Sequence, residues 1–144
     1  QGRWQMWYGS HTSWGERQED LIHVIKYAES DDGINWRRDG RAVLPLNEPE
    51  EKAMSRPCVI AEAGLYKMWY SYRPGSEYRI GYAESENGVD WQRMDSQVGL
   101  DISADGWDSE SVEYASIFQH DEDLFMLYNG NKYGATGFGL ALLE

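Results

Sequence analysis

The residues best suited to chemistry are carboxylates at and just before the start of an extended segment, residues 113–118. Glu113 opens this segment, and Asp108 and Glu110 precede it closely. A carboxyl group in a partly enclosed channel has its pKa raised, which general acid catalysis near neutral pH requires. Glu113 is therefore the first candidate for a catalytic acid or base, and Asp108 is the second. The alternative is that both are solvated loop acids of an acidic protein.

Two arginines are candidates for ligand binding. Arg56 carries the planar, five-donor group that can bind a carboxylate or a pair of hydroxyls through two hydrogen bonds. Arg73 follows an aromatic, strand-like segment, and we expect it to reach the same place. For Arg56 the alternative is a structural ion pair with Glu50 or Glu51.

Aromatic and amide side chains complete the candidate binding set. Tyr72 and Tyr114 have an apolar face and a polar tip, which suits stacking on a ligand ring as well as packing between strands. Asn129 lies in a Gly-rich run, residues 129–134, where formation of a turn is the alternative to ligand contact. The predicted substrate-binding residues are thus Arg56, Arg73, Tyr72, Tyr114 and Asn129.

No cofactor or metal ion is predicted. Residues 101–110 are rich in oxygen ligands, but their spacing differs from that of a helix–loop–helix calcium site. His11, His23 and His120 are scattered without zinc-ligand spacing, and no Gly-rich phosphate loop follows a strand and opens a helix. The single cysteine, Cys58, excludes an internal disulfide and is expected to be a small apolar residue of a strand.

An internal repeat indicates which elements position these residues. Residues 27–36 (YAESDDGINW) return as residues 82–91 (YAESENGVDW), 55 positions later. Residues 6–10 (MWYGS) match residues 68–72 (MWYSY), which match residues 126–130 (MLYNG) after a further 58 positions. Self-similarity at such a period indicates stacked supersecondary units.

The offset of 58 positions also links the candidate residues to one another. It places Ser55 and Arg56 at the positions of Glu113 and Tyr114 in the next unit. If both segments are the innermost strands of neighbouring units, these four residues converge on one mouth of a central channel.

Each unit is predicted to contain four short strands. In the middle unit these strands are expected at residues 57–61, 66–72, 79–85 and 90–94. Aromatic and β-branched residues are dense in them, and Gly, Asn, Asp and Ser separate them. Gly33 and Gly88 supply the left-handed φ of two equivalent turns. Because no segment has helical apolar periodicity of useful length, the chain is predicted to be all-β.

Four-stranded antiparallel units at this spacing are typical of β-propeller blades. The blade repeats are predicted at residues 1–46, 47–104 and 105–144, which is about two and a half blades in one partial propeller domain. A closed ring needs about four to eight blades. We therefore expect either a fragment or a ring completed by further copies. Uncovered apolar faces cost about 25 cal/mol per Å², which favours a homo-oligomer, most simply a dimer.

Charge and hydropathy exclude several classes of partner. The net charge is −12 and the isoelectric point is about 4.6, which argues against nucleic acid and anionic membrane surfaces. No apolar run approaches the length of a membrane span, and no signal peptide is visible. A cytoplasmic location is expected.

Four segments carry a family resemblance. They are residues 55–60 (SRPCVI), 68–73 (MWYSYR), 78–85 (YRIGYAES) and 128–134 (YNGNKYG). These segments resemble a group of bacterial glycosidase-like proteins, which are similar to the five-bladed propellers of the invertase, levansucrase and arabinanase superfamily. The resemblance extends through essentially the whole chain and covers the C-terminal half of the family pattern.

The resemblance implies a glycoside hydrolase-like or glycosyl-transferring protein with paired carboxylates, about 5–10 Å apart, at one end of the channel. One of these acids comes from a first blade that has no counterpart in this chain. An Arg-Asp-Pro motif often supplies a transition-state stabiliser, and the nearest string here, Ser55-Arg56-Pro57, lacks the Asp. We expect the chain to bind or act on carbohydrate at the channel mouth and to be incompetent for catalysis alone. The alternatives are a non-catalytic carbohydrate-binding module and a self-assembling scaffold without a ligand.

Overall fold

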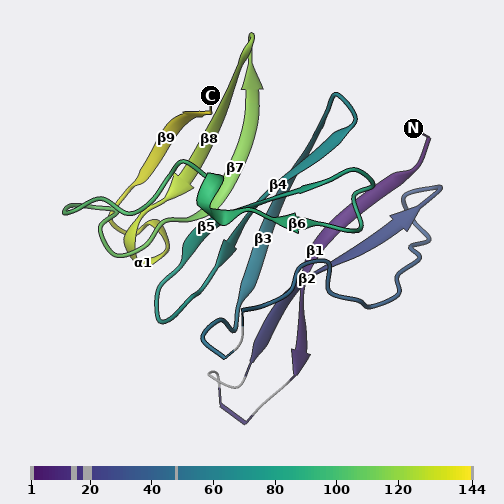
Figure 1. Ribbon diagram of the computed structural model, residues 1–144, viewed down its shortest axis with the longest axis horizontal. Coiled ribbons are helices and arrows are strands. Elements are labelled where there is room, and N and C mark those ends of the chain that lie inside the picture. The colour runs from purple at the N-terminus through teal and green to yellow at the C-terminus, as the bar shows by residue number, and fades with distance from the viewer. Residues whose placement is uncertain (1, 14–15, 18–20, 48, 144) are drawn as a thin grey trace.

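The protein consists of three antiparallel sheets that follow one another along the chain (Figure 1). The computed structural model describes residues 2–13, 16–17, 21–47 and 49–143. The first sheet contains β1 (Trp4–Ser13) and β2 (Ile22–Ser30). The second contains β3 (Met54–Glu62), β4 (Leu65–Tyr72), β5 (Arg79–Ser85) and β6 (Gln92–Arg93). The third contains β7 (Glu113–His120), β8 (Asp123–Asn129) and β9 (Phe138–Leu143).

The prediction of an all-β partial propeller is confirmed. The strands of each sheet are paired in chain order, and every pairing between them is antiparallel. Besides the strands, the described part of the chain contains a 3-10 turn, η2 (Asp95–Gln97), and a short helical turn, α1 (Asn131–Gly134). Lys132 and Tyr133 within α1 have left-handed φ values of 56° and 61°, so α1 is a tight turn rather than a true α-helix.

The outermost strand of each unit is weaker than the sequence pattern predicts. Residues 90–94 were expected to form a strand, but β6 pairs with β5 over two residues only. In the first sheet the corresponding segment contributes only the isolated bridges Glu29↔Arg37 and Lys26↔Ala42. In the second sheet, the chain leaves the sheet after Arg93 because η2 and a loop follow β6 directly.

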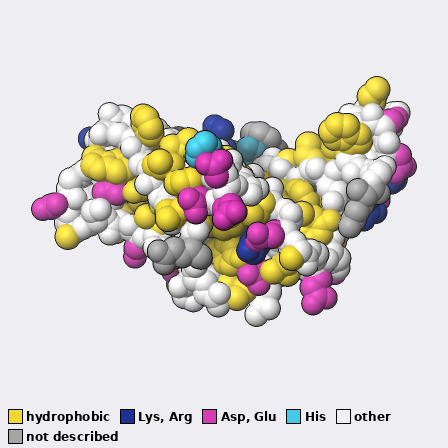
Figure 2. Space-filling view, turned by 90° about the horizontal axis from the view of Figure 1, so that it is seen from above, with side chains coloured by type: hydrophobic (Ala, Val, Ile, Leu, Met, Phe, Trp, Pro, Cys, Tyr) yellow, Lys and Arg dark blue, Asp and Glu magenta, His cyan; other side chains and the backbone are white. Residues whose placement is uncertain are grey.

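Acidic side chains are spread over the surface shown in Figure 2, while hydrophobic side chains are visible at both ends of the molecule. Among the described residues, no helix has the length and apolar character that crossing a bilayer requires.

The repeated ten-residue segment forms the same turn twice. In the first copy, the Asp32 carboxylate accepts hydrogen bonds from the backbone N–H groups of Ile34 and Asn35 at 2.8 and 2.7 Å. The Ser30 hydroxyl accepts one from the N–H of Gly33 at 2.9 Å. These bonds lower the pKa of Asp32, because they stabilise its charged form.

The second copy reproduces these bonds. The Asn87 side-chain oxygen accepts from the N–H groups of Val89 and Asp90 at 2.8 and 2.9 Å, and the Ser85 hydroxyl accepts from Gly88 at 2.9 Å. Gly88 has a φ of 76°. An Asp or Asn side chain that satisfies the turn backbone therefore explains why this segment recurs in the sequence.

Tryptophans join this turn to the neighbouring sheet. The indole N–H groups of Trp91 and Trp7 both donate to the carbonyl of Gly88, at 3.0 and 2.8 Å. The rings of Trp7 and Trp91 meet edge to face with centroids 6.0 Å apart. A Cβ atom at Gly88 would come within 3.0 Å of the Trp7 ring, so the close approach also requires glycine.

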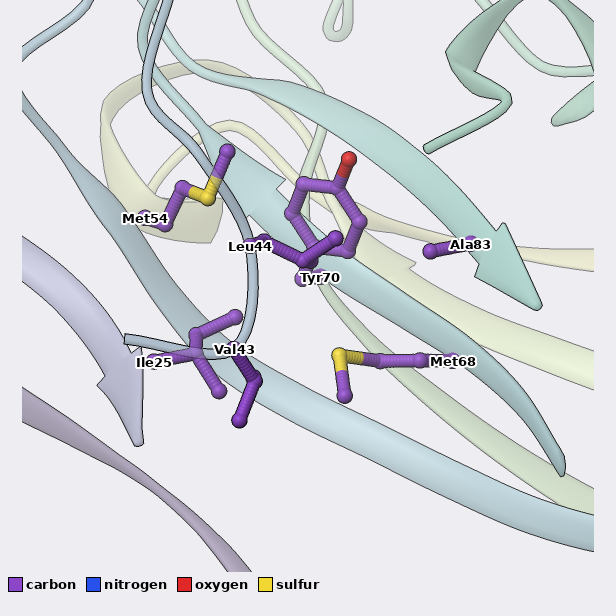
Figure 3. Close-up of a cluster of buried hydrophobic side chains, with 7 residues drawn as sticks. All are labelled: Ile25, Val43, Leu44, Met54, Met68, Tyr70 and Ala83. Atoms are coloured by element: carbon purple, nitrogen blue, oxygen red, sulfur yellow. The ribbon is translucent and has the colours of Figure 1, made fainter. Parts of the chain in front are cut away.

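Two hydrophobic clusters hold the sheets together. The first lies between the first and second sheets and includes Ile25, Met54, Met68 and Tyr70 (Figure 3). The second lies between the second and third sheets; its buried members are Trp69, Ile80, Tyr82, Val112, Ala115, Met126 and Tyr128. Each cluster is thus a contact between two sheet faces, and the second sheet contributes one face to each.

A buried charge network closes the edge of the second sheet. The Arg93 guanidinium pairs with Glu51 at 2.9 Å and with Asp95 at 2.6 Å, and it stacks over the Tyr72 ring at 4.9 Å. The Tyr70 hydroxyl donates to Asp95 at 2.5 Å. Burial raises the pKa of Tyr70, and the bond to Asp95 raises it further. The network ties the loop that contains Glu51 to β6.

Replacing Glu51 with Gln is expected to destabilise the protein by about 3 kcal/mol, because it removes one of the two carboxylates that balance the buried Arg93 charge. Urea unfolding monitored by tryptophan fluorescence measures this loss. The matched control is Glu62→Gln, whose carboxylate pairs with Lys67 at the surface. Water solvates that pair in both states, so the control should leave the urea midpoint unchanged. Equal effects of the two substitutions would contradict the role assigned to the network.

Candidate functional site

The candidate site is built on equivalent irregularities in the first strands of the second and third sheets. The pairing of β3 with β4 shifts register between Ser55 and Cys58, and that of β7 with β8 shifts between Glu113 and Ser116. Such shifts are β-bulges, which redirect side chains and are frequent next to active sites.

Each bulge holds a non-glycine residue in left-handed conformation. Arg56 has a φ of 52° and Tyr114 a φ of 61°. This conformation costs of order 1–3 kcal/mol for a residue with a side chain. The Tyr114 N–H donates to the Ser71 hydroxyl at 2.8 Å, which anchors the bulge to the second sheet. The 58-residue offset had aligned these two residues, and the structure shows that they also share their backbone conformation.

The bulges bring arginine and tyrosine side chains together. The Arg56 guanidinium lies over the Tyr114 ring, 4.8 Å from its centroid, and the Arg73 guanidinium lies 5.7 Å from that of Tyr78. Tyr78, Tyr114 and Tyr133 form a triangle in which the ring centroids are 6.0–6.3 Å apart. Stacking on aromatic faces holds the two guanidinium groups in place without consuming their hydrogen-bond donors.

Neither arginine is neutralised by an acid among the residues that the structure describes. The predicted alternative, an ion pair of Arg56 with Glu50 or Glu51, is not found among the described residues, and Glu51 pairs with Arg93 instead. Arg56 is also exposed. In a chain with a net charge of −12, two arginines without acidic partners mark this surface as distinct.

An open groove of about 490 Å³ lies beside these residues. Its walls include His23 from the first sheet, Ser55, Arg56 and Tyr78 from the second, and Tyr114 from the third. The groove therefore spans all three sheets, at the position where the sequence predicts a channel mouth.

Glu113 is buried next to the groove residues. It is 2% exposed, and its Oε1 accepts a hydrogen bond from the Tyr133 N–H at 3.1 Å. Its Oε2 has no hydrogen-bond partner among the described residues. Burial raises the pKa of Glu113 and the charge of Glu77 adds to this, while the Tyr133 N–H and the nearby Ser111 hydroxyl partly oppose it. A carboxyl group whose pKa is raised by burial suits a general acid.

The tyrosine beside this carboxyl group stays protonated under ordinary conditions. Burial raises the pKa of Tyr114 to about 12, and the nearby Glu113 charge contributes in the same direction. Its hydroxyl is therefore a hydrogen-bond donor across the physiological range.

The structure does not bring all the predicted site residues together. Arg56 and Tyr114 line the groove, Arg73 lies over the ring of Tyr78 in its wall, and Glu113 is buried directly before Tyr114 in the chain. Asn129 stands behind it and donates a hydrogen bond to the Tyr133 carbonyl at 3.2 Å, so its observed contact is one that shapes the turn.

Asp108 and Tyr72 have their contacts elsewhere. Asp108 is 5% exposed and accepts a hydrogen bond from the Tyr128 hydroxyl at 3.4 Å, within the third sheet. Tyr72 lies under Arg93 in the charge network of the second sheet.

Several groove residues, His23 among them, are not among the site residues predicted from the sequence. His23 pairs with His11 across β1 and β2, and their ring centroids are 4.3 Å apart. Burial lowers the pKa of His23, and the charges of His11 and Arg73 lower it further. The repeat offsets of 62 and 55 positions match His11 with Arg73 and His23 with Tyr78, so the register itself carried this signal. No repeat match indicates Tyr133, because a left-handed turn brings it against Tyr78 and Tyr114.

Cys58 and the acidic loops add no chemistry here. Cys58 is half-buried, and its sulfur accepts a hydrogen bond from the Ile117 N–H at 3.3 Å, which links β3 to β7. Among the described residues, no group of three or more His, Cys, Asp or Glu side chains is arranged to hold a metal ion.

The stability of the Glu113→Gln variant relative to the parent is expected to rise with pH. The folded-state pKa of Glu113 lies above its unfolded value of 4.5. The parent therefore loses stability as pH rises from 4.5 through the folded pKa, and the neutral glutamine does not. Urea unfolding at pH 4 and pH 7 measures the difference. Glu110→Gln, at an exposed carboxylate, should show no such trend. A pH-independent gap for Glu113→Gln would contradict the burial argument.

Glycine should be better than alanine at position 56. The left-handed φ of Arg56 penalises a Cβ atom, so Arg56→Gly is expected to be about 1 kcal/mol more stable than Arg56→Ala in thermal or urea unfolding. The control pair is Arg79→Gly and Arg79→Ala in β5, where glycine should be the less stable by about 0.5–1 kcal/mol. The same order at both positions would mean that Arg56 is not held in left-handed conformation.

Two relatives from different organisms illustrate what this chain is similar to. The uncharacterized protein MT1551 of Mycobacterium tuberculosis (strain CDC 1551 / Oshkosh) is 46% identical over 143 residues, which cover 99% of this chain and 48% of the relative. The 1,2-beta-oligomannan phosphorylase of Thermoanaerobacter sp. (strain X514) is 34% identical over 90 residues, which cover 59% of this chain and 29% of the relative. The chain thus spans about half the length, or less, of these curated relatives. No family model matches the sequence.

Solved structures of glycoside hydrolases share the fold. Zg3597, a family 117 glycoside hydrolase from Zobellia galactanivorans, superposes with a TM-score of 0.77 at 17% identity over 98% of this chain and 48% of the other. The GH32 β-fructofuranosidase BmSUC1 of Bombyx mori gives 0.75 at 16% identity over 100% of this chain and 32% of the other. A structure from the GH130 family of mannoside phosphorylases superposes with a TM-score of 0.68 at 19% identity, over 99% of this chain and 48% of the other. The predicted resemblance is therefore confirmed at the level of the fold: the chain has part of the β-propeller fold of these glycoside hydrolases.

Proposed function

We infer that the groove beside Arg56 and Tyr114 binds carbohydrate and that Glu113 serves as a general acid toward the bound sugar. One observation carries this inference. Two equivalent bulges turn an arginine and a tyrosine toward one groove, next to the buried carboxyl group of Glu113. Strain of this kind persists only where the surrounding structure maintains it, and it concentrates at functional sites.

The side chains of the groove suit a sugar. Tyr78 and Tyr114 present aromatic faces on which the apolar face of a sugar ring can stack. The guanidinium groups of Arg56 and Arg73 keep their donors available for pairs of hydroxyls or a carboxylate.

Glu113 supplies the acid half of a glycosidase pair. Its pKa is raised by burial, so it can hold a proton near working pH and donate it to a leaving oxygen. The family resemblance assigns the second carboxylate to a first blade that has no counterpart here. Glu77, whose charge acts on Glu113, is the acid that the structure offers nearby. The chain by itself is thus proposed to bind sugar, and turnover is proposed to require further blades.

The relatives direct the choice of substrate. A relative that is 34% identical over 90 residues is a 1,2-beta-oligomannan phosphorylase. One solved structure with this fold comes from the GH130 family of mannoside phosphorylases, which contains glycoside hydrolases that target β-1,2 mannosidic linkages. We propose β-1,2-linked mannosides as the first sugars to test.

A non-catalytic carbohydrate-binding module is the second candidate. The string Ser55-Arg56-Pro57 lacks the aspartate of the Arg-Asp-Pro motif, which removes a transition-state stabiliser but leaves the groove intact. This reading keeps the binding residues and drops the role of Glu113 as an acid.

Calorimetric titration with β-1,2-mannobiose and a panel of furanosides tests binding. Arg56→Met and Tyr114→Ala should each weaken binding by about tenfold or more, because each removes a direct ligand contact. Arg41→Met, at an exposed arginine paired with Asp90 on a distant turn, is the matched control and should bind as the parent does. Failure of every sugar to bind, or equal loss in the control, would contradict the groove assignment.

Turnover separates the two candidates. In a full-length relative that carries the equivalent glutamate, replacing that residue with glutamine should abolish hydrolysis or transfer while binding stays within about threefold. Activity that survives the substitution would eliminate Glu113 as the acid. Sugar binding without turnover in the unmodified relative would favour the binding module.

A further inference from the structure

The third sheet leaves one apolar face uncovered. Side chains alternate along β9: Phe138, Leu140 and Leu142 are 74%, 60% and 53% exposed, while Ala141 and Leu143 pack against the second sheet. Phe118 and Phe125 stack on the same face of the third sheet as the exposed β9 residues, with centroids 5.6 Å apart. An exposed row of this kind marks an interaction surface.

The repeat offset shows what this face is. Its six members, which we call the trailing face, are Phe118, Phe125, Leu127, Phe138, Leu140 and Leu142. Exactly 58 positions earlier stand Ile60, Lys67, Trp69, Ile80, Tyr82 and Glu84. Trp69, Ile80 and Tyr82 belong to the cluster buried between the second and third sheets. The trailing face is therefore the counterpart of a surface that the next sheet covers. It is also more apolar, since the earlier set includes two charged residues and the trailing face none.

The first sheet leaves uncovered the face that, in the second and third sheets, packs against the preceding sheet. Trp4, Met6 and Tyr8, which we call the leading face, alternate along β1. Their counterparts are Tyr66, Met68 and Tyr70 in β4, and Leu124, Met126 and Tyr128 in β8. Met68 and Met126 are 0% exposed because the preceding sheet covers them, whereas Met6 is 36% exposed and Trp4 61%. The same residue types are thus buried twice within the chain and left open once.

We propose that the two faces bind each other between copies of this chain, with the trailing face of one copy against the leading face of a second. This contact would repeat the one that joins the second and third sheets. Two copies related by a two-fold axis would form two such junctions and leave neither face in water. The chain covers 48% of the length of a relative that it matches almost throughout, so two copies supply about as much chain as one relative. The inference concerns assembly and is independent of any bound sugar.

Sedimentation and light scattering of the purified chain test the proposal. The expected mass is twice that of the 16.6 kDa chain, and dilution should shift the measured mass toward that of a single chain. Leu140→Glu on the trailing face and Met6→Glu on the leading face should each raise the dissociation constant by about tenfold or more, because each places a charge in an apolar contact. Ala104→Glu adds the same charge on an exposed loop and should leave the mass unchanged.

Mixing the two variants separates the proposed contact from a symmetric one. The Leu140→Glu copy keeps its leading face and the Met6→Glu copy keeps its trailing face, so the mixture should recover one junction and form a heterodimer. If trailing faces paired with each other, Met6→Glu alone would dimerise as the parent does. Circular dichroism and thermal melting identify any variant that fails to fold; Phe138→Ser and Trp4→Ser, at the two most exposed positions of the faces, then replace it.

Three results would overturn the proposal. The first is a folded monomer at every concentration up to the limit of solubility. The second is an oligomer whose dissociation constant neither face substitution changes. The third is a chain that stays monomeric until the other half of a longer relative is added, because blades of a different sequence would then be the occupant.

Discussion

Face-to-face packing between neighbouring sheets is the interaction on which the rest of this structure depends. A single sheet of two to four strands cannot bury its own apolar residues, so each sheet is stable only against the next. Met68 and Tyr70 fill the contact with the first sheet, while Trp69 and Tyr82 fill the contact with the third. Alternation along β4 thus joins three sheets through one strand.

The groove is a consequence of this packing. β3 and β7 are neighbours because their sheets share a core, and their bulges therefore face a common space. The Tyr114 N–H bond to Ser71 and the Ile117 N–H bond to Cys58 cross between the two sheets. These bonds help to maintain a left-handed tyrosine that would otherwise relax. Any change that separates the sheets should therefore disturb the groove before it disturbs either sheet.

The arginines near the groove differ from other arginines of the chain in what they contact. The chain is strongly acidic, and Arg37, Arg41, Arg79 and Arg93 all pair with carboxylates. Arg93 is drawn into the edge of the second sheet by Glu51 and Asp95. Arg56 and Arg73 instead rest on tyrosine rings. An aromatic face holds a guanidinium group without neutralising it, so these two arginines keep their capacity for a ligand.

The sequence by itself determined the sheets and their order, because alternation, turn residues and repeats are local signals that survive without contacts. The Asp32 and Asn87 turns and the alignment of Arg56 with Tyr114 follow from it directly. Only the tertiary structure decided which residues share the groove. A left-handed turn brings Tyr133 against two tyrosines of the groove wall, Tyr78 and Tyr114. Glu51 pairs with Arg93, and Asp108 accepts a hydrogen bond from Tyr128. These outcomes depend on distances between segments far apart in the chain, and the periodicity of a single segment does not specify such distances.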